Sequence, residues 1–322
     1  MPITSKHMIY TAFGFNIMSE LSLPELIEIN HKAHIDISIQ QRDLIDEWNE
    51  KSIPNRNFYV EANECLFKVP DVAIFMIENG GRIYFHPFDE AEEDQLRLYI
   101  LGTCMGSILM QRNILPLHGS AIEIDGKAFA IVGHSGAGKS TTASAFLSRG
   151  FQLVSDDVIP VTLENGIPMV TPAYPQQKLW QESLDGFGME SERYRPIINR
   201  ESKYAIPVAD RFYSKKLPLS GIIELEKVEG EEIQLKKIEK LHGLHTIFNH
   251  TYRNFMIPRM GLVDWHFSVS AQICSYTDLY TLKRPDSRFT AHELPELLLL
   301  KLEGNKYGKT IGTGIKSISQ PS

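Results

Sequence analysis

Residues 133–140 read Gly-His-Ser-Gly-Ala-Gly-Lys-Ser, which has the residue types and spacing of a phosphate-binding loop. The glycines let the backbone turn its N–H groups inward around phosphate oxygens, and the helix that follows adds partial positive charge. Lys139 is expected to reach the β- and γ-phosphates of ATP, and the Ser140 hydroxyl is expected to bind Mg²⁺. The alternative is a glycine-rich turn without a ligand. The predicted nucleotide contacts are Gly133, His134, Ser135, Gly136, Ala137, Gly138, Lys139, Ser140 and Thr141.

Two neighbouring acids, Asp156 and Asp157, follow the loop after one short predicted helix. They end a predicted buried strand beside the loop, so we expect both carboxylates to face the γ-phosphate and its metal. A kinase needs a carboxylate that takes a proton from an incoming hydroxyl, whereas a nucleotide switch needs a residue that places water. One of the two acids could therefore support the metal while the other acts as the base. The alternative is a turn with a helix cap.

His118 and Lys203 are further candidates for the same site. His118 ends the segment Ile-Leu-Pro-Leu-His, and Gly119 after it permits close approach of the backbone. A lone histidine at a strand edge is ordinarily structural, so its position alone assigns no role. Lys203 could place positive charge against the transferring phosphoryl group, or it could be a solvated surface lysine.

A metal site elsewhere is not favoured by the remaining histidines and cysteines. His242, His245 and His250 lack an HExxH pattern or a carboxylate at ligand spacing, and Gly243 weakens their presentation on a helix. The cysteines at 65, 104 and 274 are odd in number and far apart, which predicts reduced core thiols.

The loop requires a strand before it and a helix after it, and the hydrophobic pattern predicts both. Residues 127–133 form a short apolar run, preceded by the segment 119–125 and a turn at Asp125-Gly126. Residues 139–149 have helical spacing and end at Gly150, and residues 151–157 predict a second buried strand. The order is strand, loop, helix, strand.

The first part of the chain predicts an antiparallel β layer and then a long helix. Strand patterns occur at 34–39, 57–61, 65–69 and 72–86, the last of them folded around Asn79-Gly80-Gly81. An acidic run from residue 89 leads into an apolar helix that ends near residue 110. We expect a β-rich N-terminal region at 1–112 and a second domain at 113–322. In that domain, 222–238 predicts a hairpin or strand pair and 294–303 a late helix.

The composition limits the classes of function. A net charge of −7 and an acidic pI argue against a general nucleic-acid binder, which needs a surplus of lysine and arginine. No secretion signal is recognisable, and no apolar run reaches the ~20 residues that span a bilayer. We therefore expect a cytoplasmic protein without a membrane or nucleic-acid partner.

The order of Leu-His-Gly at 117–119, the loop at 133–140 and Arg-Gly-Phe-Gln-Leu-Val-Ser-Asp-Asp at 149–157 resembles the catalytic core of HPr serine kinase/phosphorylase. That family is also similar in its loop layout to phosphoenolpyruvate carboxykinases. The resemblance implies an α/β fold with a P-loop kinase domain of this type, preceded by the β-rich region. The segments 10–26, 178–180 and 203–208 resemble a subgroup encoded with lasso-peptide pathways. In that subgroup the substrate is the C-terminal serine of the precursor peptide.

The resemblance also implies a role for each matching residue. It makes His118 an active-site residue, Lys139 the phosphate ligand, Ser140 a magnesium ligand and Asp157 the proton acceptor, with Asp156 supporting the metal or its waters. ATP and Mg²⁺ are the implied cofactors, a peptide or protein serine is the implied acceptor, and members of the family are typically oligomeric.

Two departures from the family pattern bear on the substrate. Thr141 stands where the family has an acidic residue, and the family's later Glu-Ile-Arg-Gly signature is absent. HPr and reverse phosphorolysis are therefore less expected than a peptide acceptor. The alternatives are a bifunctional HPr kinase/phosphorylase, a kinase of free serine or another small molecule, and a non-catalytic nucleotide sensor.

Overall fold

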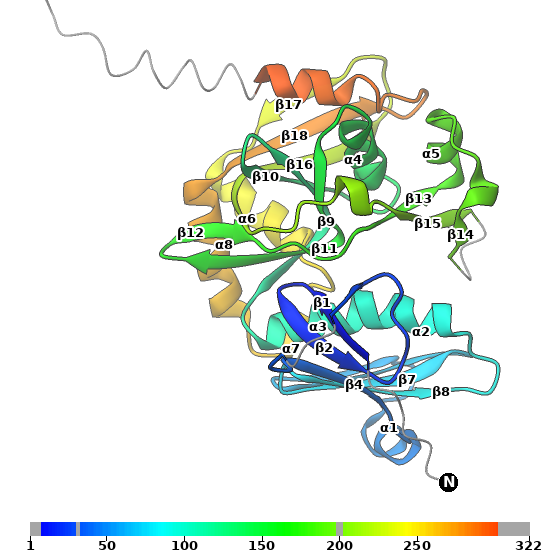
Figure 1. The fold of residues 1–322 in the computed structure, drawn as a ribbon. Helices are drawn as coiled ribbons and strands as arrows, with labels where there is room; N and C mark the ends of the chain where they lie inside the picture. The colour runs from blue at the N-terminus through cyan, green and yellow to red at the C-terminus, as the bar shows by residue number, and fades with distance from the viewer. Residues whose placement is uncertain (1–7, 30–32, 198–201, 302–322) are drawn as a thin grey trace, which may run out of the picture.

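The computed structural model describes residues 8–29, 33–197 and 202–301, which form a mixed α/β fold with two large sheets (Figure 1). The N-terminal sheet lies at the bottom of Figure 1, with helix α1 (Ile45–Lys51) beneath it. The second sheet and most helices lie above it. No helix in the described ranges is long and apolar enough to cross a membrane.

The N-terminal sheet has eight strands in the order β3-β1-β2-β4-β8-β7-β6-β5. The predicted strand pair around Asn79-Gly80 is confirmed: β7 and β8 are antiparallel, and both turn residues have positive φ. We expected an antiparallel sheet, but this sheet is mixed, because β4 pairs in parallel with both β2 and β8. Its strands are β1 (Met8–Ala12), β2 (Phe15–Ser19), β3 (Ile27–Glu28), β4 (Ile37–Gln41), β5 (Phe58–Glu61), β6 (Glu64–Val69), β7 (Ala73–Glu78) and β8 (Arg82–Pro87).

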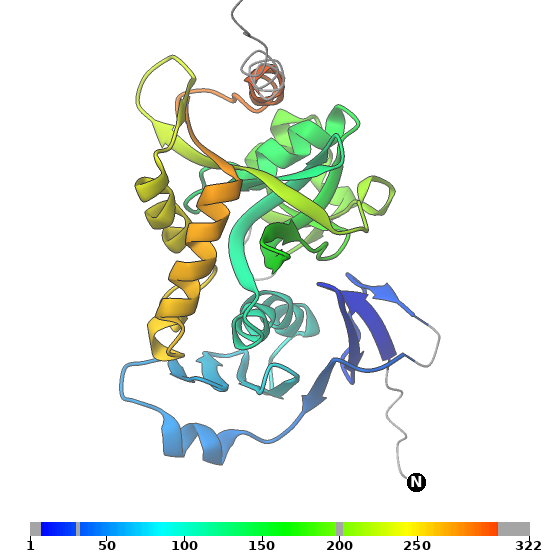
Figure 2. The same cartoon turned by 90° about the vertical axis from the view of Figure 1, so that its left-hand side faces the viewer.

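The predicted helix after the acidic run is confirmed. It comprises α2 (Glu93–Tyr99), a π-helical turn (Ile100–Cys104) and α3 (Met105–Gln111) without a break. Figure 2 shows this stretch nearly end-on between the N-terminal sheet and the second half of the molecule. Residues 100–110 are all buried, which explains their apolar sequence as core packing.

The second sheet has the order β10-β9-β11-β12-β16-β18-β17, and an additional pairing of β10 with β16 closes five of its strands into a ring. The predicted turn at Asp125-Gly126 is confirmed, with positive φ at both residues between β9 and β10. Helix α4 (Lys139–Ser148) follows the loop after β10. The strands are β9 (Leu115–Ile124), β10 (Lys127–Val132), β11 (Gln152–Glu164), β12 (Ile167–Val170), β16 (Leu217–Val228), β17 (Gln234–Lys237) and β18 (Asp278–Pro285).

Two expectations for this sheet were wrong. Strand β11 does not end at Asp157 but continues to Glu164, because the residues after Asp157 still pair with β9 and β12. Strands β16 and β17 do not form a hairpin, because β18 from much later in the chain inserts between them. Both errors concern long-range pairing, which local pattern does not specify.

A small third sheet and several helices complete the described structure. The small sheet has the order β13-β15-β14, and the short helix α5 directly follows β13 in the chain. The predicted late helix is present from residue 294 to 301, where the described part ends. The remaining elements are β13 (Gln176–Trp180), α5 (Gln181–Gly186), 3₁₀ turns at Ser191–Arg193 and Ala209–Arg211, β14 (Arg195–Pro196), β15 (Lys203–Pro207), α6 (Lys240–Asn249), α7 (Met256–Arg259) and α8 (Val263–Tyr276).

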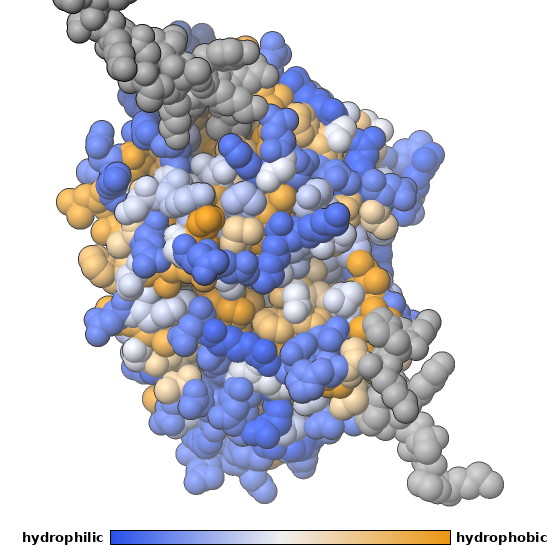
Figure 3. Space-filling view, turned by 60° about the vertical axis from the view of Figure 1, so that its left-hand side comes forward, coloured by the Kyte–Doolittle hydropathy of each residue, from blue (hydrophilic) through white to orange (hydrophobic). Residues whose placement is uncertain are grey.

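The two halves share a hydrophobic core. Val158, Tyr174 and Met256 from the second half pack in one cluster with the N-terminal sheet and with α3. The three cysteines are free and buried, as expected. The face in Figure 3 is largely hydrophilic, with apolar residues in separate groups.

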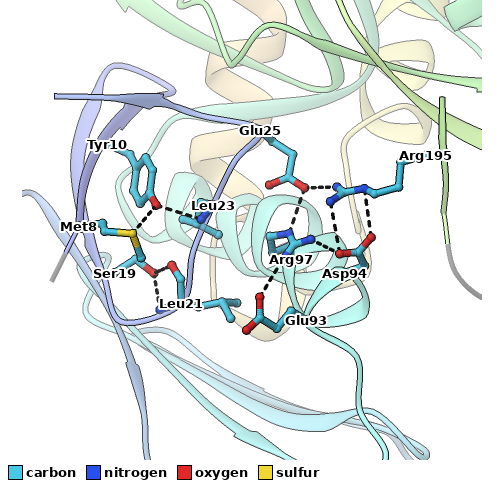
Figure 4. Close-up of polar contacts among 10 residues, drawn as sticks. All are labelled: Met8, Tyr10, Ser19, Leu21, Leu23, Glu25, Glu93, Asp94, Arg97 and Arg195. Atoms are coloured by element: carbon cyan, nitrogen blue, oxygen red, sulfur yellow. Dashed lines mark hydrogen bonds and ion pairs between the residues drawn. The ribbon is translucent and has the colours of Figure 1, made fainter. Parts of the chain in front are cut away.

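An ionic network with a buried centre also joins the halves (Figure 4). Glu25 accepts hydrogen bonds from Arg97 Nε at 3.0 Å and from Arg195 Nη2 at 2.5 Å, and Asp94 pairs with both arginines. The side chains of Arg97 and Glu25 are each only 6% exposed. Because Arg195 belongs to β14, the network fixes the third sheet against α2 and the N-terminal region.

Candidate active site

The loop between β10 and α4 has the backbone that its glycines predict. Gly136 and Gly138 have φ values of +79° and +103°, a region that side-chain-bearing residues rarely adopt. Gly133 is required for space as well, because a Cβ there would lie 2.5 Å from the carbonyl oxygen of Leu225 on β16. The loop therefore lies directly against the neighbouring parallel strand.

Lys139 and Ser140 begin the helix at the mouth of this loop. Lys139 Nζ donates to the carbonyl oxygens of Gly133 at 2.9 Å and His134 at 3.1 Å, so the ammonium lies inside the curve of the loop. Burial is the largest influence on Lys139 and lowers its pKa, although nearby aspartates oppose this effect. A desolvated ammonium at this position is suited to an anionic ligand.

Asp156 organises the hydroxyl groups beneath the loop. Its Oδ1 accepts from Ser120 Oγ at 2.5 Å and from Ser140 Oγ at 2.9 Å, and its Oδ2 accepts from the backbone N–H of Lys178 at 2.9 Å. The residue is 3% exposed. Because Ser140 donates its hydrogen to Asp156, the lone pairs of its oxygen are free to face a cation.

Ser140 and Asp156 fit a magnesium ion whose remaining ligands are oxygens of phosphate and water. Ser140 offers one ligand oxygen, and Asp156 holds that oxygen instead of facing the loop itself. In the part of the chain that the structure describes, no group of three or more His, Cys, Asp or Glu residues could hold a metal. Mg²⁺ commonly takes few protein ligands and fills its shell with phosphate oxygens and water.

Asp157 forms a separate cluster with Lys178 and His118. Lys178 Nζ lies 2.7 Å from Asp157 Oδ2. His118 Nδ1 lies 3.0 Å from the Asp157 carbonyl oxygen and 3.4 Å from Oδ1. Asp157 has a φ of +74°, an uncommon conformation for a residue with a side chain. The backbone twist within β11 thus places consecutive acids in different surroundings.

The ionisation states in this cluster follow from burial and charge. Burial alone would raise the pKa of Asp157, but the ammonium of Lys178, together with the imidazolium that His118 becomes at low pH, outweighs it and holds this pKa well below its ordinary value. Burial would likewise lower the pKa of Lys178, and the Asp157 carboxylate reverses that effect. For His118 burial prevails and its pKa is lowered. At neutral pH the cluster is an ion pair beside a neutral imidazole.

Gly119 lies between the loop strand and the strand that carries Asp157. It pairs across the sheet with Val132 on one side and Asp157 on the other. A Cβ on Gly119 would lie 2.3 Å from the carbonyl oxygen of Ile131, a distance no side chain tolerates. The glycine therefore lets β9 and β10 approach closely. His118 precedes the residue that pairs with Val132, the last residue of the loop strand.

The N-terminal region supplies the opposite wall of the site. The π-helical turn and α3 present Gly102 and Gly106 to the ring of Tyr252, and a Cβ on either would lie within 3 Å of that side chain. The Tyr252 ring also lies 5.5 Å from that of His118. π-helical turns often occur at functional sites. Here the turn brings Thr103 to the same wall.

A cavity of about 980 Å³ opens between these walls. Its lining includes most of the predicted site residues: His118, Ser135, Gly136, Gly138, Lys139, Ser140, Thr141, Asp156, Asp157 and Lys203. Three predicted residues do not line it. Gly133 packs on β16, Ala137 is buried, and the His134 ring lies against that of His250 at 5.5 Å.

Lys203 and Thr141 have specific surroundings in this cavity. Lys203 on β15 is half-buried, and its ammonium lies 5.3 Å from the centre of the Trp180 ring. Thr141 hydrogen-bonds to Ser183 at 2.7 Å and so connects α4 to α5. Thr141 is therefore engaged in joining two helices.

Sequence reasoning missed several lining residues. Lys178 was not predicted as a site residue, although the segment 178–180 that contains it carries the resemblance to the lasso-pathway subgroup and could have indicated it. No sequence pattern indicated Tyr252, Arg253 or Arg284, because these residues reach the cavity from distant segments. Arg284 Nε donates to the Ala137 carbonyl at 2.9 Å, so it supports the loop from outside.

The three histidines near residue 245 lie in different surroundings. His250 is buried, and its Nε2 lies 2.8 Å from Glu224 Oε1. The hydrogen bond with His250 is the largest cause of the lowered pKa of Glu224. His242 and His245 are exposed on α6. His250 is therefore a structural partner of β16.

The sequence similarity to known proteins includes the segment that contains the loop and the two acids. Residues 111–182 match the HPr Serine kinase C-terminal domain. The HPr kinase/phosphorylase of Lactobacillus gasseri is 30% identical over 158 residues, 46% of this chain and 43% of that protein. That of Aromatoleum aromaticum is 38% identical over 118 residues, 34% of each chain. The chain thus spans less than half the length of these curated relatives.

Among solved structures, that of the HPr(Ser) kinase/phosphatase from Coxiella burnetii covers 61% of this chain and 98% of its own. The sequence identity is 16% and the TM-score is 0.30. These values are low, so the similarity to this family rests on the sequence of residues 111–182 and on the relatives named above.

Proposed function

We propose that this protein is an ATP-dependent serine kinase with an HPr-kinase-like P-loop domain at 113–322, and that its acceptor is a peptide or protein hydroxyl. The observation that carries the proposal is a single cavity lined by the loop residues Lys139 and Ser140 and, beyond them, by the Asp157–Lys178 ion pair. A nucleotide held by the loop would direct its γ-phosphate toward this pair. The most specific acceptor is the C-terminal serine of a lasso precursor peptide, on the resemblance of 10–26, 178–180 and 203–208.

In the proposed reaction the serine Oγ bonds to the γ-phosphorus, and the bond from that phosphorus to the β–γ bridging oxygen breaks. ADP leaves, and the hydroxyl proton passes to Asp157. Magnesium, when bound, would neutralise charge on the phosphate oxygens. Lys139 stabilises the transferring group, because phosphoryl transfer depends mainly on positioning and electrostatics.

Lys178 has a positioning role in this scheme. Its ammonium keeps Asp157 ionised and fixes one carboxylate oxygen at 2.7 Å, which leaves the other near His118 for an incoming hydroxyl. A carboxylate with a lowered pKa is a weak base. It suffices where the transition state is loose, because the hydroxyl loses its proton late.

The N-terminal region would then bind the acceptor. Leu98, Tyr99 and Thr103 line the same cavity as the loop, so a substrate lying between the halves contacts both. We propose residues 1–112 as this acceptor-binding region. The ionic network of Figure 4 supports a fixed relation between it and the small sheet that carries Lys178.

The test is mass spectrometry of acceptors after incubation with ATP and Mg²⁺. A precursor-type peptide ending in serine, HPr and free serine are compared, with Lys139→Ala as the control that should transfer nothing. Phosphate on the peptide supports the proposal. Phosphate on HPr alone would favour the activity for which the relatives are named, and ATP binding without transfer to any acceptor would favour a nucleotide sensor.

A further inference from the structure

Arg253 is a cation of the cavity that the proposed reaction does not use. It lines the cavity on the wall formed with the N-terminal region. Its guanidinium Nη2 donates to Thr103 Oγ1 at 3.3 Å, and the group lies over the rings of Phe58 and Tyr252 at 5.6 and 5.9 Å. Among the residues that the structure describes, no carboxylate lies within ion-pair distance of it.

The backbone at Arg253 is held in an uncommon conformation. Its φ is +53°, in the left-handed region that costs a residue with a side chain of order 1 kcal/mol or more. The preceding Tyr252 is fixed by its contact with Gly102 and Gly106, and its backbone N–H donates to the carbonyl of Pro116 at 2.7 Å. The turn therefore places the arginine in the lining of the cavity, with the residue still exposed to solvent.

The position of Arg253 relative to Asp157 suggests its ligand. A Cβ on Gly102 would lie 2.9 Å from the Tyr252 hydroxyl and 3.9 Å from Asp157 Oδ2, so the proton acceptor and this wall adjoin. Thr103, which accepts from Arg253, is the next residue along the turn. An anionic group bound by Arg253 would thus lie close to the hydroxyl presented to Asp157.

We propose that Arg253, positioned by Thr103, binds the free carboxylate of the acceptor, so that the enzyme selects a serine at the very C-terminus of a peptide. The inference rests on the proposed function, which already names a C-terminal serine as acceptor, and adds the residue that recognises its carboxylate. A guanidinium matches a carboxylate through two parallel N–H···O hydrogen bonds, and both partners are charged. The nucleotide end of the cavity has its own arginine, Arg284, against the loop.

The experiment compares two peptides of one sequence ending in serine, one with a free carboxylate and one with a C-terminal amide. The wild type should phosphorylate the acid with a kcat/KM about 10-fold or more above that of the amide, the usual worth of a hydrogen bond to a charged group. Arg253→Gln should lower kcat/KM for the acid to the value for the amide. The KM for ATP should not change, because the arginine does not serve the nucleotide.

Arg259→Gln is the matched control. Arg259 packs over the ring of Phe255 in the same segment but does not line the cavity. It should keep the full preference for the acid. Thr103→Val, which removes only the hydroxyl that holds Arg253, should weaken the preference while Arg253 remains. Thermal unfolding of each variant excludes loss of fold as the cause.

Binding without transfer separates this inference from the kinase proposal. Titration calorimetry with the same peptides ending in alanine in place of serine should give an affinity about 10-fold higher for the acid than for the amide. Equal affinities, or equal kcat/KM values on acid and amide, would overturn the carboxylate site while leaving the kinase intact. A raised KM for ATP in Arg253→Gln would also overturn it. Absence of transfer to either serine peptide, with only HPr phosphorylated, would overturn the carboxylate site and the peptide acceptor, while leaving an ATP-dependent kinase of a protein serine.

Discussion

Replacement of Lys178 by methionine tests the ion pair at the centre of the site. Methionine keeps most of the volume of the lysine stem but removes the ammonium that lies 2.7 Å from Asp157. The side chains of Lys178 and Asp157 are only 9% and 21% exposed, so the remaining carboxylate would be largely buried without its partner. We expect Lys178→Met to destabilise the fold and to abolish or strongly reduce transfer.

The size of the effect follows from burial. Removing one partner of a buried pair costs about 3–5 kcal/mol, and the partial exposure of Asp157 and the neighbouring His118 place this case near 3 kcal/mol. The melting temperature should fall by about 5 °C or more. The control is Lys216→Met, because Lys216 also lies 2.7 Å from a carboxylate, that of Glu164, but the pair is about half exposed. Its loss should cost less than about 1 kcal/mol.

The pH dependence gives the prediction a sign. In the wild type the pKa of Asp157 is lowered, so the stabilisation from the pair is present above the unfolded pKa of about 4 and is lost as the pH falls below it. Without the ammonium, burial dominates and raises the pKa of Asp157 in the folded protein. The penalty of Lys178→Met should then be largest at neutral pH and shrink as the pH falls toward 4.

Urea denaturation of both variants and of the wild type at pH 7.5, 6 and 4.5 measures these differences. Adding Asp157→Asn to Lys178→Met should restore part of the lost stability, with a coupling energy of about 1–3 kcal/mol. Equal midpoints for Lys178→Met and Lys216→Met would refute the reasoning. A penalty that grows as the pH falls would refute it as well.

Four further outcomes are expected. Lys139→Ala should abolish transfer and weaken ATP binding while thermal unfolding stays cooperative, since the loop keeps its N–H groups but loses its ammonium. Asp157→Asn should keep ATP affinity within a few-fold and lower kcat by about 10²–10⁴, the worth of a positioned base; an unchanged kcat would exclude Asp157 from proton transfer. Gly119→Ala should lower stability by more than about 3 kcal/mol in urea, because its Cβ meets the Ile131 carbonyl, whereas Gly126→Ala has open space and should cost about 1–2 kcal/mol for its positive φ. Burial lowers the pKa of His266 to about 4, so stability should fall as the pH drops from 6.5 to 4, by about 3 kcal/mol in total, and His266→Gln should remove this part of the slope.

The sequence alone determined the parts of the site that depend on local pattern. The glycines and Lys139 of the loop, the turn at Asp125-Gly126 and the helix after the loop were predictable, because each depends on the conformational limits of a few adjacent residues. The acids at 156 and 157 were also identified from their spacing. The roles assigned to these residues stay predictions until the variants above are measured.

Only the tertiary structure decided how the acids differ and what faces them. The positive φ of Asp157 within a continuous β11 sends its side chain to Lys178, while Asp156 stays with Ser140. No local pattern specifies these partners, because Lys178 and His118 reach Asp157 from other strands. The N-terminal wall was hidden for a similar reason. Gly102 and Gly106 meet Tyr252 across some 150 residues of chain, and that contact arises when apolar surfaces of both halves are buried in one core.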